Sequence, residues 1–274
     1  MRLMKKAMGT AAALALSVSL LAGCGSAADT ASAAESTPAE STVSSAAESE
    51  PAESTSAASE AAAEPAESEA ADENKAAAAK LLDDLTGSYQ ELWPVILADE
   101  YTQTWLDDCA PLVGEENAEA AYEKLSSMVT GDVYGEEAVT AYANGGGAYF
   151  CGFTQDMVTL TVDGASSTIS GTDKDGSELF SHTYHYVGME PVRGLYEFES
   201  DDADSGEFTY FYFAPDTSDE TYHIEFRYGS DAEALGQYDA GNYAYWLASG
   251  IATDCDETMI NNCIELFCTE NLAG

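Results

Sequence analysis

The sequence predicts a mainly β domain, an antiparallel sheet or barrel, with flanking α-helices at its N- and C-terminal ends. Two observations lead to this prediction. Between residues 148 and 230, short runs of β-branched and aromatic residues alternate with Gly, Asp and Pro, which is typical of sequential antiparallel strands. On both sides of this region, stretches of helix formers or of apolar residues at helical spacing favour helices.

The first third of the domain is expected to be helical. Residues 74–87 are rich in helix formers and end at Gly87, a residue that favours helix termination. Residues 88–96 follow and are interrupted by Pro94. Residues 115–131 form a second candidate helix, again closed by a glycine. No strand is predicted before residue 148.

The pattern of the central region predicts a series of strands. Asp163-Gly164 and Asp175-Gly176 are hairpin-turn signals. Further strand candidates follow, namely residues 178–188, 193–200, 207–215 and 221–229. In 208–213, "FTYFYF", the apolar/polar alternation is lost, which predicts burial on both faces or an aromatic barrel interior.

The C-terminal region returns to a helix. Asp254, with Glu257 three residues later, resembles a capping box that begins it. A single apolar stripe at helical spacing then follows, formed by Met259, Ile260, Cys263, Ile264, Phe267 and Cys268. This stripe favours a core role for Cys263 and Cys268 over a disulfide or metal role.

The N-terminus has the pattern of an export signal. Residues 1–23 carry a basic start and a short apolar run that ends in Leu21-Ala22-Gly23, directly before Cys24. This pattern closely resembles a bacterial lipobox, in which the cysteine is lipidated and becomes the mature N-terminus. We therefore expect an extracytoplasmic protein, anchored by lipid at Cys24 to the cell membrane. An ordinary cleaved signal and an uncleaved anchor are the alternatives.

Residues 24–74 are expected to form a tether, and residues 75–274 a single folded domain. After Cys24 the tether is nearly all Ala, Ser, Glu, Thr and Pro, and it repeats Pro-Ala-Glu-Ser three times. Such a composition cannot bury enough apolar surface to offset the entropy of ordering the chain. A binding tail is the alternative. The remaining 200 or so residues suffice for one sizeable core.

The charge excludes one class of partner. With 50 acidic and 9 basic residues the formal net charge is −41, so no basic patch is available to neutralise phosphates, and nucleic acid is excluded. The sequence also lacks a nucleophile elbow, a phosphate loop and an H-E-x-x-H motif, so we expect no enzyme.

The cysteines leave their pairing open. Besides Cys24 the sequence has five, which are Cys109, Cys151, Cys255, Cys263 and Cys268. No two of them have the C-x-x-C spacing of a zinc ribbon or a thioredoxin site. An exported protein is permitted disulfides, but the sequence does not select a pair.

Residues 221–231, "TYHIEFRYGSD", hold the most informative polar residues. If this strand is regular, one face carries Tyr222, Ile224, Phe226 and Tyr228, and the other carries His223, Glu225 and Arg227. His223 and Glu225 leave the same face of the strand, so they suit two ligands of one metal ion. A buried polar network of the same residues with Arg227 is the alternative.

The order of these segments resembles the ZinT/YodA family, a domain also appended to bacterial zinc-binding lipoproteins of the AdcA type. The resemblance covers residues 79 to 270, begins with "LTGSYQELWPVI" (85–96), and is most specific between Phe208 and Asp231. It implies a lipocalin-like (calycin) antiparallel β-barrel, with a zinc site at the barrel mouth.

The resemblance carries over only part of the family's three-histidine site. His223 falls on the first position of the family's His-x-His pair, and Glu225 stands where the second histidine is expected. The third position falls on Phe211, which has no donor atom. His182 or His185, three residues apart on an earlier strand, is a candidate replacement, with at most one turned inward.

The resemblance thus implies a lipoprotein that binds a divalent metal, zinc first, for recruitment or delivery to uptake. Its partner would be a metal-uptake transporter or the binding protein of one. The alternative is a lipocalin-like module for a non-metal small ligand or a protein partner, with a degenerate metal site.

Overall fold

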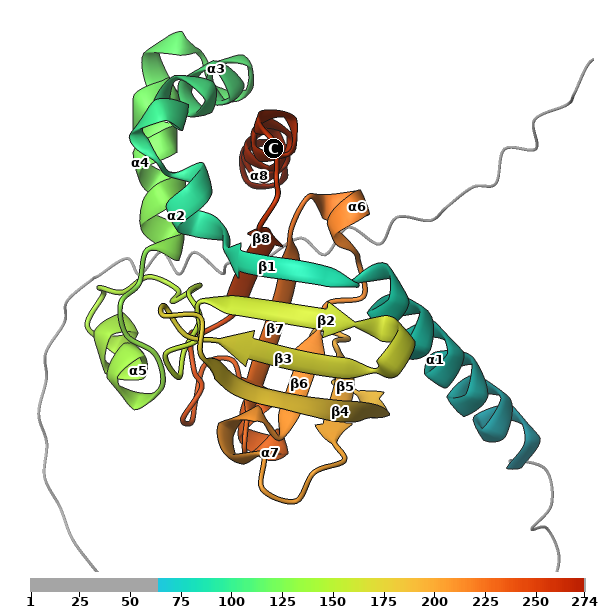
Figure 1. The fold of residues 1–274 in the computed structure, drawn as a ribbon. Helices are drawn as coiled ribbons and strands as arrows, with labels where there is room; N and C mark the ends of the chain where they lie inside the picture. The colour runs from blue at the N-terminus through green and yellow to red at the C-terminus, as the bar shows by residue number, and fades with distance from the viewer. Residues whose placement is uncertain (1–63, 274) are drawn as a thin grey trace, which may run out of the picture.

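The computed structural model describes residues 64–273, with side chains from residue 72 onward, and within this part of the chain eight strands close into an antiparallel barrel (Figure 1). Each strand pairs with its neighbour in the sequence, and the last pairs with the first. The predicted fold class, a lipocalin-like antiparallel barrel with flanking helices, is confirmed. The predicted signal peptide, Cys24 and most of the predicted tether lie outside the described residues.

The strands are β1 Gly87–Glu91, β2 Thr159–Asp163, β3 Thr168–Thr172, β4 Glu178–Met189, β5 Tyr196–Ser200, β6 Tyr210–Phe213, β7 Ile224–Gly229 and β8 Ala248–Ala252. The helices are α1 Glu64–Asp84, α2 Leu92–Ile96, α3 Thr102–Val113, α4 Ala118–Val129, α5 Glu136–Ala143, α6 Ser218–Thr221, α7 Ala232–Leu235 and α8 Glu257–Leu272. Short 3₁₀ turns are η1 Asp99–Tyr101, η2 Glu115–Asn117, η3 Gly164–Ser166 and η4 Gly206–Phe208.

The strand β1 corrects the prediction that the first third is helical. It lies between α1 and α2 and closes the barrel by pairing with both β2 and β8. Its Tyr89 is buried in the barrel interior, and the Tyr89 hydroxyl donates to the carbonyl of Leu85 (2.9 Å). Five residues are too few to show a clear strand period beside two helices, so the pairing of β1 depends on partners distant in the sequence.

The helix α1 begins at Glu64, inside the segment 24–74 for which no packed structure is expected. Its sequence is dominated by Ala and Glu, both strong helix formers, and Pro65 stands in the first turn, where proline is tolerated. The helix α1 therefore extends into the segment that the composition predicts to be a tether.

The barrel interior is filled with aromatic side chains. Phe211 stacks on Tyr228 with ring centroids 5.2 Å apart, and Phe226 meets Phe153 edge to face at 5.2 Å. Tyr212, on the outer face of β6, is buried as well, and its hydroxyl donates to the carbonyl of Ala232 (3.0 Å). The prediction for "FTYFYF" is thus confirmed, because the interior is aromatic and both faces are buried.

A second core lies outside the barrel. The helices α2, α3, α4 and α8 gather at one end of the barrel (Figure 1) and bury a separate apolar cluster. The predicted stripe of α8 faces this cluster, with Ile260, Cys263, Ile264 and Cys268 buried. The N-cap of α8 is Asp256, not Asp254 as predicted, because Asp256 accepts the hydrogen bond from the Met259 N–H (2.9 Å).

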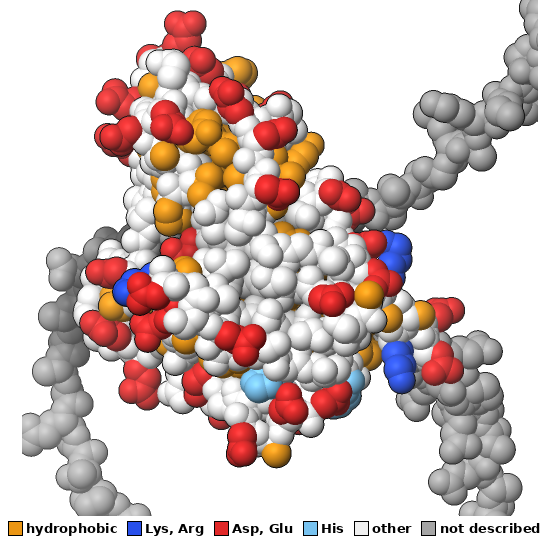
Figure 2. All heavy atoms as spheres, in the orientation of Figure 1, with side chains coloured by type: hydrophobic (Ala, Val, Ile, Leu, Met, Phe, Trp, Pro, Cys, Tyr) orange, Lys and Arg blue, Asp and Glu red, His pale blue; other side chains and the backbone are white. Residues whose placement is uncertain are grey.

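The surface of the molecule is acidic. Asp and Glu side chains are spread over the visible face, whereas Lys and Arg are few (Figure 2). Hydrophobic side chains gather over α3 and α4 in the same view. Within residues 64–273, no helix is both long and apolar enough to cross a membrane.

Candidate functional site

His223 and Glu225 form a pair at the start of β7. The strand begins at Ile224, three residues later than predicted, because Tyr222 has a positive φ of 63° and ends α6. Ile224 packs in the barrel interior, so its neighbours His223 and Glu225 lie on the outer side. Nε2 of His223 lies 4.0 Å from Oε1 of Glu225, and the two side chains are 18% and 33% exposed.

The turn before β7 fixes the orientation of the His223 ring. Nδ1 lies 2.6 Å from the carbonyl oxygen of Thr221, and the Thr221 hydroxyl donates to the carbonyl of His223 (2.6 Å). A carbonyl only accepts hydrogen bonds, so Nδ1 carries a proton. Nε2, on the opposite edge of the ring, is therefore the nitrogen available to face Glu225.

The pair lines a small cavity outside the barrel, closed by α2 and α8. Its volume is about 40 Å³, close to that of a single water molecule. Besides the pair it is lined by Leu92, Trp93, Ile96, Cys263, Leu266, Phe267, Glu270 and Asn271. A drug-sized organic ligand needs roughly 300 Å³ or more, so the space suits an ion rather than such a molecule.

Acidic groups crowd around the His223 imidazole. Burial raises the pKa of Glu225, and Asp216 raises it further, whereas His223 and Arg193 lower it. Burial likewise raises the pKa of Glu270, His223 opposes this, and repulsion by Glu225 and Asp216 adds to it. Carboxylates forced together in this way are stabilised by a bound proton or cation.

The surroundings of His223 shift the pKa of its imidazole in both directions. Burial lowers the pKa of its imidazole, but the Cys263 thiol, the Glu225 carboxylate and the Thr221 carbonyl outweigh burial and raise it to about 10. Without a metal, His223 is therefore protonated at neutral pH and forms an ion pair with Glu225. A metal ion at Nε2 has to displace that proton.

Cys263 and Glu270, both on α8, differ as candidate third ligands. The Cys263 sulfur lies 3.9 Å from Nδ1 of His223, which is the edge already turned to Thr221. Cys263 is therefore on the wrong side to share an ion with Nε2. Glu270 lines the same cavity and interacts electrostatically with His223 and Glu225, so it is the better candidate.

Sequence reasoning missed Glu270, although a signal for it exists. Glu270 follows Cys263 by seven residues, so it lies on the same side of α8 as Cys263, although Glu270 itself is exposed. The indole Nε1 of Trp93, which lines the same cavity, has no hydrogen-bond partner among the described residues.

The structure does not bring His182 and His185 to this site. Both lie on β4, which pairs with β3 and β5 and not with β7. Nδ1 of His182 lies 2.8 Å from Asp202, and Nδ1 of His185 lies 2.7 Å from Asp201. Each histidine thus has a carboxylate partner of its own.

The predicted polar network of His223, Glu225 and Arg227 is not formed. Arg227 is fully buried and donates to the carbonyls of Leu235, Gln237 and Tyr243. Its guanidinium carbon lies 4.4 Å from the centroid of the Tyr238 ring. A different segment covers Arg227, so it does not compete for the Glu225 carboxylate.

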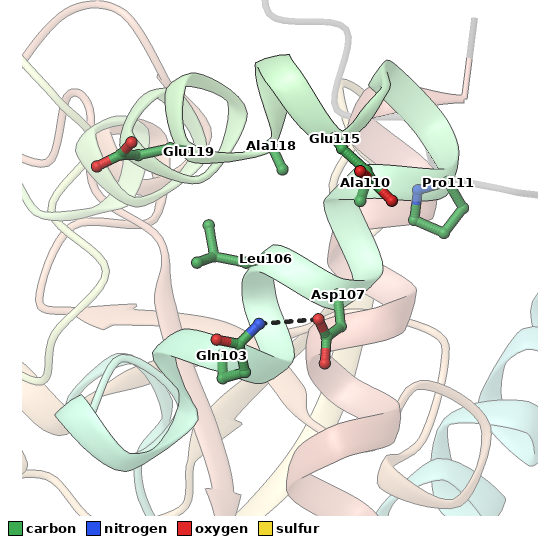
Figure 3. A pocket seen from close by; sticks show the side chains of 8 residues that line it. All are labelled: Gln103, Leu106, Asp107, Ala110, Pro111, Glu115, Ala118 and Glu119. Atoms are coloured by element: carbon green, nitrogen blue, oxygen red, sulfur yellow. Dashed lines mark hydrogen bonds between the residues drawn. The ribbon is translucent and has the colours of Figure 1, made fainter.

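A larger groove lies on the surface of α3 and the start of α4 (Figure 3), with a volume of about 660 Å³. It is lined by Gln103, Leu106, Asp107, Ala110, Pro111, Glu115, Ala118 and Glu119. Gln103 donates to Asp107 (2.8 Å), and Figure 3 shows Glu115 and Glu119 well apart. The carboxylates do not converge, so this groove is no cation site.

In the geometry observed, residues 72–273 contain no group of three or more His, Cys, Asp or Glu side chains arranged to hold a metal. The distance between the two donor atoms of the His223–Glu225 pair is slightly too long for zinc. Two ligands of one tetrahedral zinc, with bonds of about 2.0–2.2 Å, lie roughly 3.4 Å apart. Nε2 and Oε1 would have to approach by about 0.6 Å from their 4.0 Å separation. A side-chain torsion provides such a shift.

No protein-family model matches the sequence, and no curated protein matches it. Among solved structures, the chain is similar to the Zn(II)-bound ZinT-like domain of Streptococcus pneumoniae AdcA, with 18% identity and a TM-score of 0.42 over 68% of this chain and 89% of that one. It is also similar to Zn(II)-bound AdcA from the same organism, with 16% identity and a TM-score of 0.40 over 66% of this chain and 34% of AdcA. This chain thus spans about a third of AdcA. The first of these structures is of a ZinT-like domain, the kind of domain that the sequence resembles.

Proposed function

We propose that this protein binds a divalent metal ion, zinc first, through Nε2 of His223 and the carboxylates of Glu225 and Glu270. The observation that carries the proposal is the hydrogen bond from Nδ1 of His223 to the Thr221 carbonyl. Metal-binding histidines are commonly oriented in this way, with one ring nitrogen donating to a carbonyl and the other free for the ion.

The three proposed donor groups suit a metal ion and determine which metals the site prefers. One imidazole and two carboxylates suit zinc, and the oxygen donors make Mn²⁺ a stronger competitor than it would be at three histidines. The role proposed is binding rather than catalysis. We further propose a lipid anchor at Cys24 and delivery of the metal to an uptake transporter or its binding protein. Loss of membrane retention in Cys24→Ala tests the anchor.

Zinc titration of the purified, metal-free protein tests the site. At a free zinc concentration of a hundred times Kd, the free energy of unfolding should rise by about 2.7 kcal/mol, or roughly 5–10 °C in Tm. His223→Ala should abolish the shift, and Glu225→Gln and Glu270→Gln should each weaken it. His185→Ala is the matched control, because His185 is exposed and pairs with Asp201.

Two further measurements separate the site from general charge effects. Mg²⁺ at equal ionic strength reports how much any cation stabilises this acidic chain. Because the metal displaces a proton from His223, whose pKa is about 10, the zinc affinity should rise up to tenfold per pH unit between pH 7 and 9. The proposal would be contradicted if zinc raised the Tm no more than Mg²⁺ does, or if zinc raised the Tm of His223→Ala as much as that of the wild-type protein.

A further inference from the structure

Two cysteines that are distant in the sequence meet in the helical layer outside the barrel. Cys109 lies in α3 and Cys268 in α8, and their sulfurs are 3.7 Å apart. Both residues are completely buried. Among the hydrogen-bond contacts of the described cysteines, this is the one that joins two thiols. Cys151 contacts the Tyr149 carbonyl, and Cys263 contacts Nδ1 of His223.

The surroundings of the two thiols are apolar. They belong to the same buried cluster as Trp105 and Ile264, and the Trp105 ring packs against Phe267 at 6.0 Å. A disulfide bond has a sulfur–sulfur length of about 2.05 Å, so the two sulfurs would have to approach by about 1.7 Å. Rotations about the two Cα–Cβ bonds move sulfurs by such distances while the helices stay in place.

We propose that Cys109 and Cys268 are oxidised to a disulfide bond that links α3 to α8. The oxidant is the disulfide of a small thiol or of a thiol–disulfide oxidoreductase. One cysteine thiolate attacks it and forms a mixed disulfide, releasing the first thiol. The second cysteine then attacks the mixed disulfide and releases the second thiol. The two cysteines lose two protons and two electrons, and the oxidant is reduced to two thiols.

The burial of both thiols indicates when the bond forms. Burial raises the pKa of Cys109 and of Cys268, so the reactive thiolate is scarce once the helices have packed. With no exposed surface, neither sulfur is accessible to an oxidant in the folded protein. The bond therefore forms during folding, before α3 and α8 close over it, and is afterwards protected from reductants.

The bond would hold the helix that lines the His223 cavity. Cys268 lies two residues before Glu270 on α8, whose buried residues Ile260, Cys263 and Ile264 pack in the same apolar cluster. The linked residues enclose a long loop that contains nearly the whole barrel. A cross-link of this kind stabilises the fold mainly by restricting the unfolded chain.

Oxidative folding of the full-length chain tests the proposal. The denatured and reduced protein is refolded with reduced and oxidised glutathione, denatured again, alkylated and mapped by mass spectrometry. We expect two cysteines protected from alkylation and one cross-linked peptide pair containing Cys109 and Cys268. Reduction of the oxidised protein under denaturing conditions, followed by refolding without oxidant, should lower its Tm by about 10 °C.

Cysteine-to-alanine variants test which two residues form the disulfide. Cys109→Ala and Cys268→Ala should each abolish the cross-link and the difference in Tm between oxidised and reduced protein. Cys151→Ala, which removes another buried cysteine, should keep both. Alkylation of every cysteine in the wild-type protein after oxidative folding, or a cross-link between a different pair, would overturn the proposal. The peptide map of the oxidised wild-type protein tests the proposal even if a variant fails to fold.

Discussion

Arg227 and Glu225 show how two charged residues on one strand face acquire different roles. They are two residues apart on the outer face of β7, but different segments cover them. Backbone carbonyls from the end of α7 and the chain that follows it surround the guanidinium of Arg227, whereas Glu225 faces a small cavity beneath α8. Arg227 thus has a structural role, whereas the Glu225 carboxylate remains available for an ion.

Arg227→Met should destabilise the protein by about 3 kcal/mol or more. The substitution leaves the carbonyls of Leu235, Gln237 and Tyr243 buried without their donor, and each unpaired buried acceptor costs roughly 1–3 kcal/mol. Urea denaturation measures the change. Lys174→Met is the control, because Lys174 is exposed, and it should change stability by less than about 0.5 kcal/mol. A loss below about 1 kcal/mol for Arg227→Met would contradict this account of the residue.

At the scale of elements, the site depends on the meeting of β7 and α8. The strand β7 supplies Glu225, the residue directly before the strand is His223, and the helix supplies Glu270, which lines the same cavity. The position of α8 is set at its start, where Asp256 caps the first turn, and along its length by the apolar stripe. A change at the cap therefore tests how firmly the helix is held.

Asp256→Ala should cost about 1 kcal/mol, because it removes the acceptor for the Met259 N–H and the negative charge at the helix N-terminus. Asp254→Ala, two residues earlier, is the matched control. It removes a nearby negative charge without removing a capping hydrogen bond, so its cost should be less than half as large. Both values come from urea denaturation of the metal-free protein. Equal losses in the two variants would show that charge, and not the cap, fixes the helix start.

At the scale of the whole molecule, the excess of acidic groups opposes folding. A net charge of −41 brings like charges together when the chain becomes compact. Figure 2 shows acidic groups spread over the visible surface, with few basic groups between them. On this face of the molecule the repulsion is therefore distributed and not confined to one patch.

Raising NaCl from about 0.01 M to about 0.15 M should increase the Tm of the metal-free protein, because the screening length falls from roughly 30 Å to roughly 8 Å. His223→Ala should show the same increase as the wild-type protein, since one side chain changes little of the total charge. A Tm that stays constant or falls with salt would mean that surface repulsion does not limit stability.

Much of the fold could be predicted from the sequence, because the relevant signals are local. The pleat of a strand places residues two apart on one face, and His223 and Glu225 keep this arrangement although His223 directly precedes β7. The Asp-Gly turns, the aromatic interior of "FTYFYF" and the buried stripe of α8 are local patterns of the same kind.

The remaining features were decided by tertiary structure. The strand β1 is recognised only when β2 and β8 pair with it, and Glu270 shares a cavity with His223 only because of where α8 packs. The separate positions of His182 and His185 follow in the same way from the order of strands around the barrel. The physical reason is that a local pattern specifies which face of an element is buried, whereas the contact partner is selected by closure of the barrel and packing of the helices, which depend on the whole chain at once.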